Sequence, residues 1–215
     1  AAPNAPSISV LPAAPRIVAL SDIHGQYGLL VRLLRAHQVI DAQDRWALGK
    51  DTLVVAGDVF DRGPQVTEAF WLLYGLQQQA AAAGGAVHFV LGNHETMVLY
   101  DDLRYVNPKY LRSAQLLGRS YPQLYGKDSV IGQWLRTRPV LLKIGDTLFL
   151  QADGAIRQVP TPPGLLEQWR NPLPADALPA DLQAEDLGSQ ALDGVQTRHY
   201  RLRGAQPGER LEYWV

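Results

Sequence analysis

Residues 57–63 read GDVFDRG and directly follow an apolar run, residues 52–56, that is typical of a buried strand. Two aspartates three residues apart, an arginine and a glycine at each end put more charge here than an ordinary turn carries. Gly57 and Gly63 allow the backbone to turn tightly and to approach a ligand closely. The stretch therefore predicts a loop with a chemical role at the end of a buried strand.

Two other segments have the same arrangement. Residues 21–25 (SDIHG) follow an apolar run at 16–20, and residues 92–95 (GNHE) follow one at 87–91. Taken singly, each could be the cap of the next helix. Because ligands of open α/β sheets bind beyond the carboxyl ends of the strands, the three segments together predict one site.

The residue types expected at this site indicate metal-dependent phosphate chemistry. Carboxylate, imidazole and amide groups bind divalent metal ions, and the planar guanidinium of arginine binds phosphate oxygens. The chain has no cysteine, which excludes thiol-based phosphatase chemistry. The side chains that should converge are Asp22, His24, Asp58, Asp61, Arg62, Asn93 and His94.

These segments resemble the signature of the calcineurin-like, phosphoprotein-phosphatase-type metallophosphoesterases. Residues 57–76, 88–97 and 103–110 resemble the bacterial Shewanella-like phosphatase branch of that family. The resemblance covers residues 16 to about 150 and implies an α/β fold, a sheet core flanked by helices. It also implies hydrolysis of phosphomonoesters on proteins, with phosphotyrosine favoured, by water that two metal ions activate.

The resemblance implies a set of metal ligands. Asp22 and His24 would bind the first ion, Asp58 would bridge both ions, and Asn93 would offer its amide oxygen to the second. Mn²⁺ is the expected ion, with Fe or Zn²⁺ as alternatives.

The resemblance implies further roles around the phosphate. His94 would protonate the leaving group, and Asp61 would orient His94 and support its charged form. Arg62 and Arg104 would bind phosphate oxygens. Arg104 lies in residues 95–138, which are expected to form a helical cap over the site.

The chain departs from the family pattern after an expected hairpin of residues 140–144 and 147–150. The family has there a histidine that completes the second metal site, and Asp153 is the best positional match in this chain. A later Gly-His pair, whose histidine is the family's remaining ligand, is absent, and His199 is the one later histidine. A surface strand residue is the ordinary interpretation of His199. The second ion is therefore expected to bind weakly or to be absent.

The rest of the sequence predicts a single domain over residues 16–215, with a divergent part at 151–215. Helices are expected at 27–40 and 66–83, the second stopped by two glycines, with Trp71 in the core. Short strands are expected at 197–203 and 210–215.

Residues 1–15 are rich in alanine and proline and predict a mobile leader. Their small-residue start is typical of a chain cut by signal peptidase, which favours a periplasmic or secreted protein, with a cytoplasmic one as the alternative. The net charge of −1 gives no reason to expect nucleic acid or an anionic membrane as a partner. The oligomeric state stays open.

Two other functions fit the same residues. Related folds with these early motifs hydrolyse dinucleoside polyphosphates. A metal-poor pseudophosphatase that binds phosphorylated partners would also retain most of the motifs.

Overall fold

The computed structural model describes residues 8–152, 155–156, 159–160, 183–192, 195–203 and 210–214. The chain divides into two compact units, residues 1–160 and 161–215, whereas the sequence predicts one domain over residues 16–215. The predicted site residues that the structure describes all lie in the first unit. Asp153 and the side chain of His199 lie outside the described part of the molecule.

A parallel sheet of three strands is the centre of the first unit. The strands β2 (Ile17–Leu20), β3 (Thr52–Ala56) and β4 (Ala86–Val90) lie in the order β2-β3-β4. Every residue of β3 is buried, as expected for a parallel strand covered on both faces. The strands match the ranges predicted from the apolar runs to within one residue at each end.

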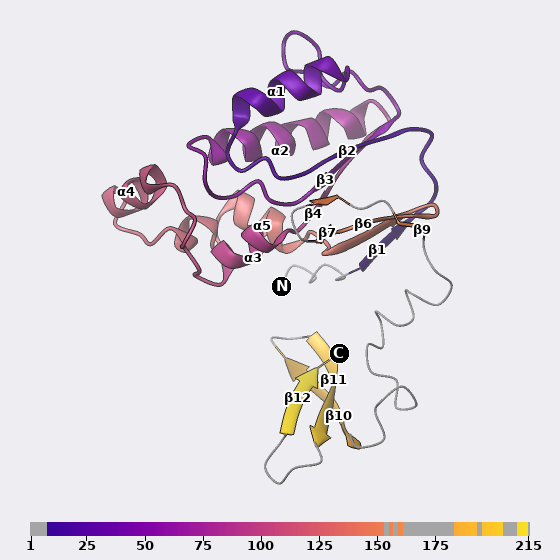
Figure 1. The fold of residues 1–215 in the computed structure, drawn as a ribbon, viewed down its shortest axis with the longest axis vertical. Helices are drawn as coiled ribbons and strands as arrows, with labels where there is room; N and C mark the ends of the chain where they lie inside the picture. The colour runs from indigo at the N-terminus through magenta and orange to yellow at the C-terminus, as the bar shows by residue number, and fades with distance from the viewer. Residues whose placement is uncertain are drawn as a thin grey trace. The chain divides into compact units, whose positions relative to one another are not determined.

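Two helices pack against one face of this sheet (Figure 1). The helix α1 (Tyr27–Ala36) is shorter than predicted, because the backbone leaves the helix at His37 and Gln38 has a φ of 57°. The helix α2 (Val66–Ala82) stops before Gly84, as predicted.

The prediction that Trp71 lies in the core is wrong. Its side chain is 49% exposed, whereas Phe70 is 1% exposed. Successive helix residues point about 100° apart, so the face of α2 that buries Phe70 turns Trp71 outward. Trp71 instead packs edge-on against Tyr74 on the same helix, with 5.6 Å between ring centroids.

A second sheet covers the other face of the central sheet. It has the order β1-β5-β6-β9, with β1 (Ile8–Leu11), β5 (Leu141–Ile144), β6 (Thr147–Phe149) and β9 (Val159–Pro160). The predicted hairpin of β5 and β6 is confirmed. The two sheets bury an apolar cluster between them, formed by Val54, Val90, Leu142, Ile144 and Phe149.

The strand β1 differs from the mobile leader expected for residues 1–15. Residues 8–11 pair in parallel with β5, and Leu11 packs against the apolar cluster between the two sheets. Ile8 and Leu11 are partly buried, so strand pairing and these apolar contacts together hold the segment against the first unit. A further short pair joins β7 (Gln151–Ala152) to β8 (Ala155–Ile156).

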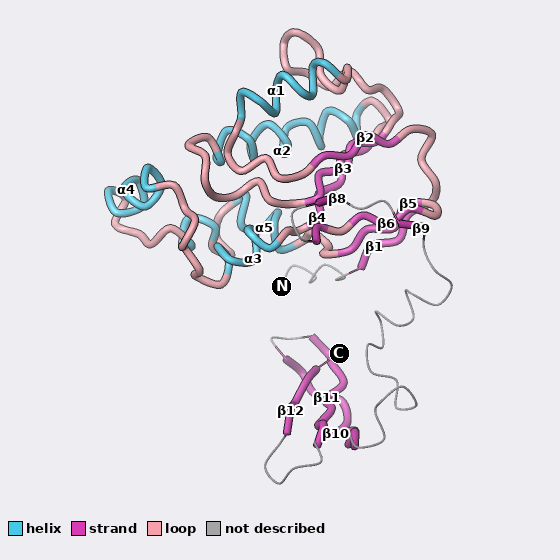
Figure 2. Tube along the Cα trace, in the orientation of Figure 1, coloured by secondary structure: helices cyan, strands magenta, loops and turns pink. Residues whose placement is uncertain are grey.

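The segment between β4 and β5 is helical, as predicted. It contains α3 (Asn93–Leu99), α4 (Pro108–Leu116), the 3-10 helix η1 (Pro122–Tyr125) and α5 (Val130–Arg136). Figure 2 shows α3 and α5 beside β4, with α4 further out at the edge of the first unit. Phe60, from the loop after β3, packs into this insert with its ring 4.7 Å from that of Tyr125. The insert and the loop after β3 therefore share one core.

The second unit contains an antiparallel sheet in the order β10-β11-β12. The predicted strands are present as β11 (Val195–Arg203) and β12 (Arg210–Trp214), and β10 (Gln183–Leu192) was not predicted. In the described part of the chain, no helix has the length and apolar character needed to cross a bilayer.

Candidate metal centre

The carboxyl ends of β2, β3 and β4 bring the predicted side chains together. One ligand atom from each of His24, Asp58 and His94 lies within 4.8 Å of the other two, and all three residues are buried. Asp22 adds a carboxylate, with Oδ1 3.8 Å from His24 Nε2. The structure thus brings these four side chains together, and their roles as ligands stay a prediction.

Strained backbone is concentrated at this site. Of the eight non-glycine residues with positive φ in the described segments, five are predicted site residues. The left-handed conformation costs roughly 1–2 kcal/mol per residue for a side chain other than glycine, so the surrounding contacts must hold it in place. These five residues are Asp22 (56°), His24 (45°), Asp58 (56°), Asp61 (70°) and Arg62 (62°).

Backbone hydrogen bonds lock the loops after β2 and β3 to each other. The N–H of His24 donates to the carbonyl of Asp58 at 2.9 Å, and the N–H of Gly63 donates to the carbonyl of His24 at 2.9 Å. A Cβ at residue 63 would lie 2.3 Å from the His24 oxygen, so only glycine allows this approach. The two loops therefore form one rigid unit.

His24 is oriented for metal binding. Its Nδ1 donates to the carbonyl of Phe60 at 2.9 Å, which directs Nε2 toward Asp22 as the nitrogen that can bind a metal ion. A ligating histidine is commonly held by such a bond from its other nitrogen. Neutral imidazole with adjacent carboxylates is a donor set that divalent metal ions accept, so the residues present fit the metal that the motifs imply.

Asp58 is the buried carboxylate at the centre of the cluster. Asp58 is 2% exposed, and this burial raises the pKa of its carboxyl group. The backbone N–H of His94 donates to Oδ1 at 3.1 Å and opposes that shift. Its other oxygen, Oδ2, accepts a hydrogen bond from Gln151 Nε2 at 2.7 Å. Asn93 is exposed as the first residue of α3, and its role in a second metal site stays a prediction.

His94 and Asp61 form the predicted pair. His94 Nδ1 lies 2.6 Å from Asp61 Oδ2, with both side chains buried. Burial raises the pKa of Asp61, and the hydrogen bond from His94 opposes that shift. In the described segments, Asp61 Oδ1 is buried without a hydrogen-bond partner. His94 is therefore the main partner of this carboxylate, and its Nε2 remains available for proton transfer.

The two predicted phosphate ligands differ in their surroundings. Arg62 has an exposed side chain, and its backbone N–H donates to the carbonyl of Tyr105 at 2.9 Å. Arg104 forms a two-bond ion pair with Asp102, with Nε to Oδ1 at 2.9 Å and Nη2 to Oδ2 at 2.7 Å. This hydrogen bonding lowers the pKa of Asp102. The phosphate-binding role of both arginines stays a prediction.

Glu95 is a structural residue to which the sequence analysis gave no role. It is fully buried, and its carboxylate accepts hydrogen bonds from the backbone N–H groups of Asp58, Val59, Phe60 and Gly92. Burial raises the pKa of Glu95, and the backbone donors oppose the shift. A Glu at the third residue of a helix, bonded to the N–H before that helix, is half of a capping box. The GNHE pattern contains that signal.

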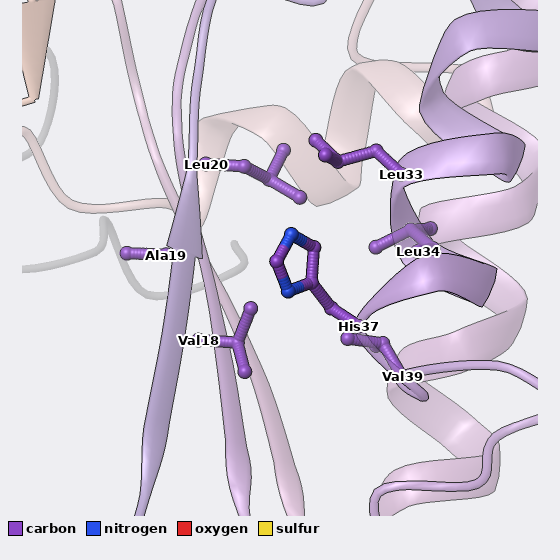
Figure 3. Close-up of a pocket in the computed structure, with 7 residues that line it drawn as sticks. All are labelled: Val18, Ala19, Leu20, Leu33, Leu34, His37 and Val39. Carbon is purple, nitrogen blue, oxygen red and sulfur yellow. The ribbon is translucent and has the colours of Figure 1, made fainter.

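An apolar cavity lies away from the metal cluster. It has a volume of about 140 Å³ and lies between β2 and α1. Figure 3 shows the His37 ring pointing from the end of α1 toward Val18 and Leu20. His37, the residue that follows α1, thus lines this cavity and is separate from the metal cluster.

Comparison with known proteins agrees with this geometry. The profile of the calcineurin-like phosphoesterases matches residues 15–190. Shewanella-like protein phosphatase 2 of Arabidopsis thaliana is 37% identical over 101 residues, covering 47% of this chain and 26% of the relative. Shewanella-like protein phosphatase 1 of Plasmodium berghei is 32% identical over 139 residues, covering 62% of this chain and 38% of the relative.

A solved structure extends the comparison to the fold. The cold-active protein-tyrosine phosphatase of a psychrophilic Shewanella species is 42% identical, with a TM-score of 0.66, covering 80% of this chain and 48% of that one. This chain therefore spans about half, or less, of the length of these relatives. Since the family profile covers most of the chain and its metal-binding motifs meet in one buried cluster, the chain belongs to the calcineurin-like phosphoesterases.

Proposed function

We propose that this protein is a metal-dependent phosphomonoester hydrolase that acts on phosphorylated proteins, with phosphotyrosine favoured. The observation that carries the proposal is the combination of the His24–Asp58 cluster with the buried His94–Asp61 pair. A metal cluster alone would also suit a binding protein, whereas an oriented histidine beside it provides a proton donor for a leaving group.

The protein's own side chains account for positioning and proton transfer. His94 Nδ1 donates to Asp61, and in the doubly protonated, charged imidazole Nε2 carries the proton that the leaving oxygen receives. The same carboxylate stabilises the charged imidazole before the transfer. Arg62 offers an exposed guanidinium for the phosphoryl oxygens, and its loop is fixed by the bond to Tyr105.

The metal ligands would be Asp22, His24, Asp58 and Asn93, with Asp153 as a further predicted ligand. Ions bound there would supply an activated water and would neutralise charge on the phosphoryl group. We propose Mn²⁺ as the ion that supports activity best, because carboxylate and amide oxygens suit a hard ion.

The preference for an aryl phosphate rests on Tyr105. Its ring is 47% exposed and lies 5.4 Å from the His94 ring. An aromatic leaving group bound next to the proton donor would contact this ring, and aromatic pairs stabilise each other by about 0.5–1.5 kcal/mol beyond area burial. The phosphotyrosine phosphatase among the structural relatives supports the same substrate class.

The test is hydrolysis by the purified chain of phosphotyrosine peptide, phosphoserine peptide and diadenosine tetraphosphate, each with added Mn²⁺ or a chelator. We expect the phosphotyrosine peptide to be cleaved fastest, with activity lost on chelation. Asp58→Asn should reduce turnover by more than about a hundredfold, because it weakens a central ligand.

Two outcomes would contradict the proposal. Faster cleavage of diadenosine tetraphosphate than of either peptide would make the chain a dinucleoside polyphosphate hydrolase. Tight binding of phosphopeptide without turnover, at saturating Mn²⁺, would make it a pseudophosphatase.

Tyr105→Leu should lower the preference for phosphotyrosine over phosphoserine and leave Mn²⁺ affinity unchanged.

A further inference from the structure

Gln151 makes a contact with the metal cluster that the family motifs do not account for. It lies on β7, and its Nε2 donates to Asp58 Oδ2 at 2.7 Å across 93 residues of chain. The Gln151 side chain is half-buried and Asp58 is 2% exposed, so the bond lies inside the site.

This contact determines which oxygen of Asp58 lies next to Gln151. Asp58 Oδ1 already accepts the backbone N–H of His94 at 3.1 Å, which leaves Oδ2 as the oxygen that Gln151 engages. A carboxylate can bridge two ions through one oxygen or through both, so Oδ2 is open to a metal ion in either arrangement. The tip of the Gln151 side chain therefore lies next to Oδ2, where it could share an ion with Asp58.

The two side chains form a hydrogen bond, and their spacing is also short enough for both to reach one ion. Adjacent oxygen ligands of an octahedral ion, with bonds of about 2.1 Å at right angles, lie about 3 Å apart. The 2.7 Å between Gln151 Nε2 and Asp58 Oδ2 is close to that value. Rotation about the last side-chain bond, which is a broad torsion, exchanges Nε2 for the oxygen Oε1.

We propose that Gln151 is a ligand of the second metal ion through Oε1, an inference that rests on the proposed two-metal function. Without the ion, the amide nitrogen of Gln151 donates to Asp58 Oδ2; with the ion, the amide would turn so that its oxygen faces the metal beside Asp58. An amide oxygen makes the second site selective for Mn²⁺ or Mg²⁺ over Zn²⁺.

The test is a Mn²⁺ titration of the whole 215-residue chain by calorimetry, with electron paramagnetic resonance to detect a coupled pair of ions. The variants are Gln151→Ala, which removes both amide atoms, and Gln151→Glu, which keeps an oxygen but cannot donate to Asp58. Gln133→Ala is the matched control, because Gln133 is exposed and its amide donates to the Lys127 carbonyl at 2.9 Å.

We expect two Mn²⁺ sites in the wild type, with the affinity of the second lowered about 10–100-fold in Gln151→Ala and the first unchanged. Gln151→Glu should retain the second ion and the coupled signal. Gln133→Ala should match the wild type.

The opposing results separate this inference from the proposed function. Second-site affinity that is unchanged or increased in Gln151→Ala would overturn the ligand role alone. Loss of the second ion in Gln151→Glu as well as in Gln151→Ala would show that Gln151 acts only as a hydrogen-bond donor to Asp58. A wild type that binds a single ion would overturn the inference, and one that binds none would overturn the proposed function with it.

Discussion

Glu95→Gln is the substitution that best tests how the site is held together. In the wild type, Oε1 accepts the N–H groups of Val59 (2.8 Å) and Phe60 (3.3 Å), and Oε2 accepts those of Asp58 and Gly92 (2.8 Å each). Glutamine replaces one of these oxygens with an NH₂ group, which cannot accept. Two buried backbone N–H groups therefore lose their acceptor.

The expected loss of stability follows from these bonds. A hydrogen bond to a charged group contributes about 1.5–3 kcal/mol, so losing two costs about 3–6 kcal/mol. This is a large part of the 5–15 kcal/mol or so that holds a typical domain folded. Because Asp58 has a φ of 56° and is held by one of the bonds, its affinity for Mn²⁺ should fall as well.

The assay is urea unfolding of the metal-free protein followed by far-UV circular dichroism, with a parallel Mn²⁺ titration. Glu68→Gln is the control, because the Glu68 side chain is 41% exposed and lies 3.6 Å from Lys109 in a surface ion pair. We expect the control to change stability by no more than about 1 kcal/mol. If Glu95→Gln also lowers the free energy of unfolding by less than about 1 kcal/mol, Glu95 is already protonated in the folded protein and the reasoning is refuted.

Three further predictions test other parts of the molecule. His94→Asn should lower turnover by about 10²–10⁴ on phenyl phosphate and by less on nitrophenyl phosphate, whose leaving group needs little protonation; equal losses would give His94 another role. Gly92→Ala would place a Cβ 2.2 Å from Asp58 Oδ1, so we expect weaker Mn²⁺ binding and a loss of about 1–3 kcal/mol in urea unfolding, and unchanged affinity would contradict it. Burial lowers the pKa of His88 below its ordinary 6.5, so the unfolded chain binds more protons and stability should fall as the pH drops below 6.5, by up to about 1.4 kcal/mol per pH unit. His88→Leu should reduce that slope, as measured by unfolding between pH 5 and 7, and an unreduced slope would assign it to other groups.

The local pattern was sufficient to predict the central strands and the helices of the first unit. Apolar runs of about five residues define β2, β3 and β4, because a parallel strand buried on both faces needs apolar side chains throughout. The glycine pair after α2 marks its end, since few other residues adopt positive φ. The polar residues that follow each strand were identified as a site because parallel strands end at one edge.

The pattern failed where burial depends on distant parts of the chain. Trp71 is exposed although its type favours the core, because the rotation of α2 is set by the sheet below it. Residues 8–11 carry little periodicity and form a strand only because β5, more than a hundred residues later, offers an open edge.

The sequence by itself determined which side chains could bind metal and phosphate and on which loops they lie, because residue type and strand order are local properties. Only the tertiary structure decided how they are held: the bond from His24 to the Phe60 carbonyl, the four backbone donors on Glu95, and the contact of Gln151 with Asp58. His24 and Phe60 are 36 residues apart in the sequence, Glu95 and Asp58 are 37 apart, and Gln151 and Asp58 are 93 apart. No local spacing of residues encodes contacts over such distances. They exist because packing the two sheets and the helical insert brings the strand ends within hydrogen-bonding distance.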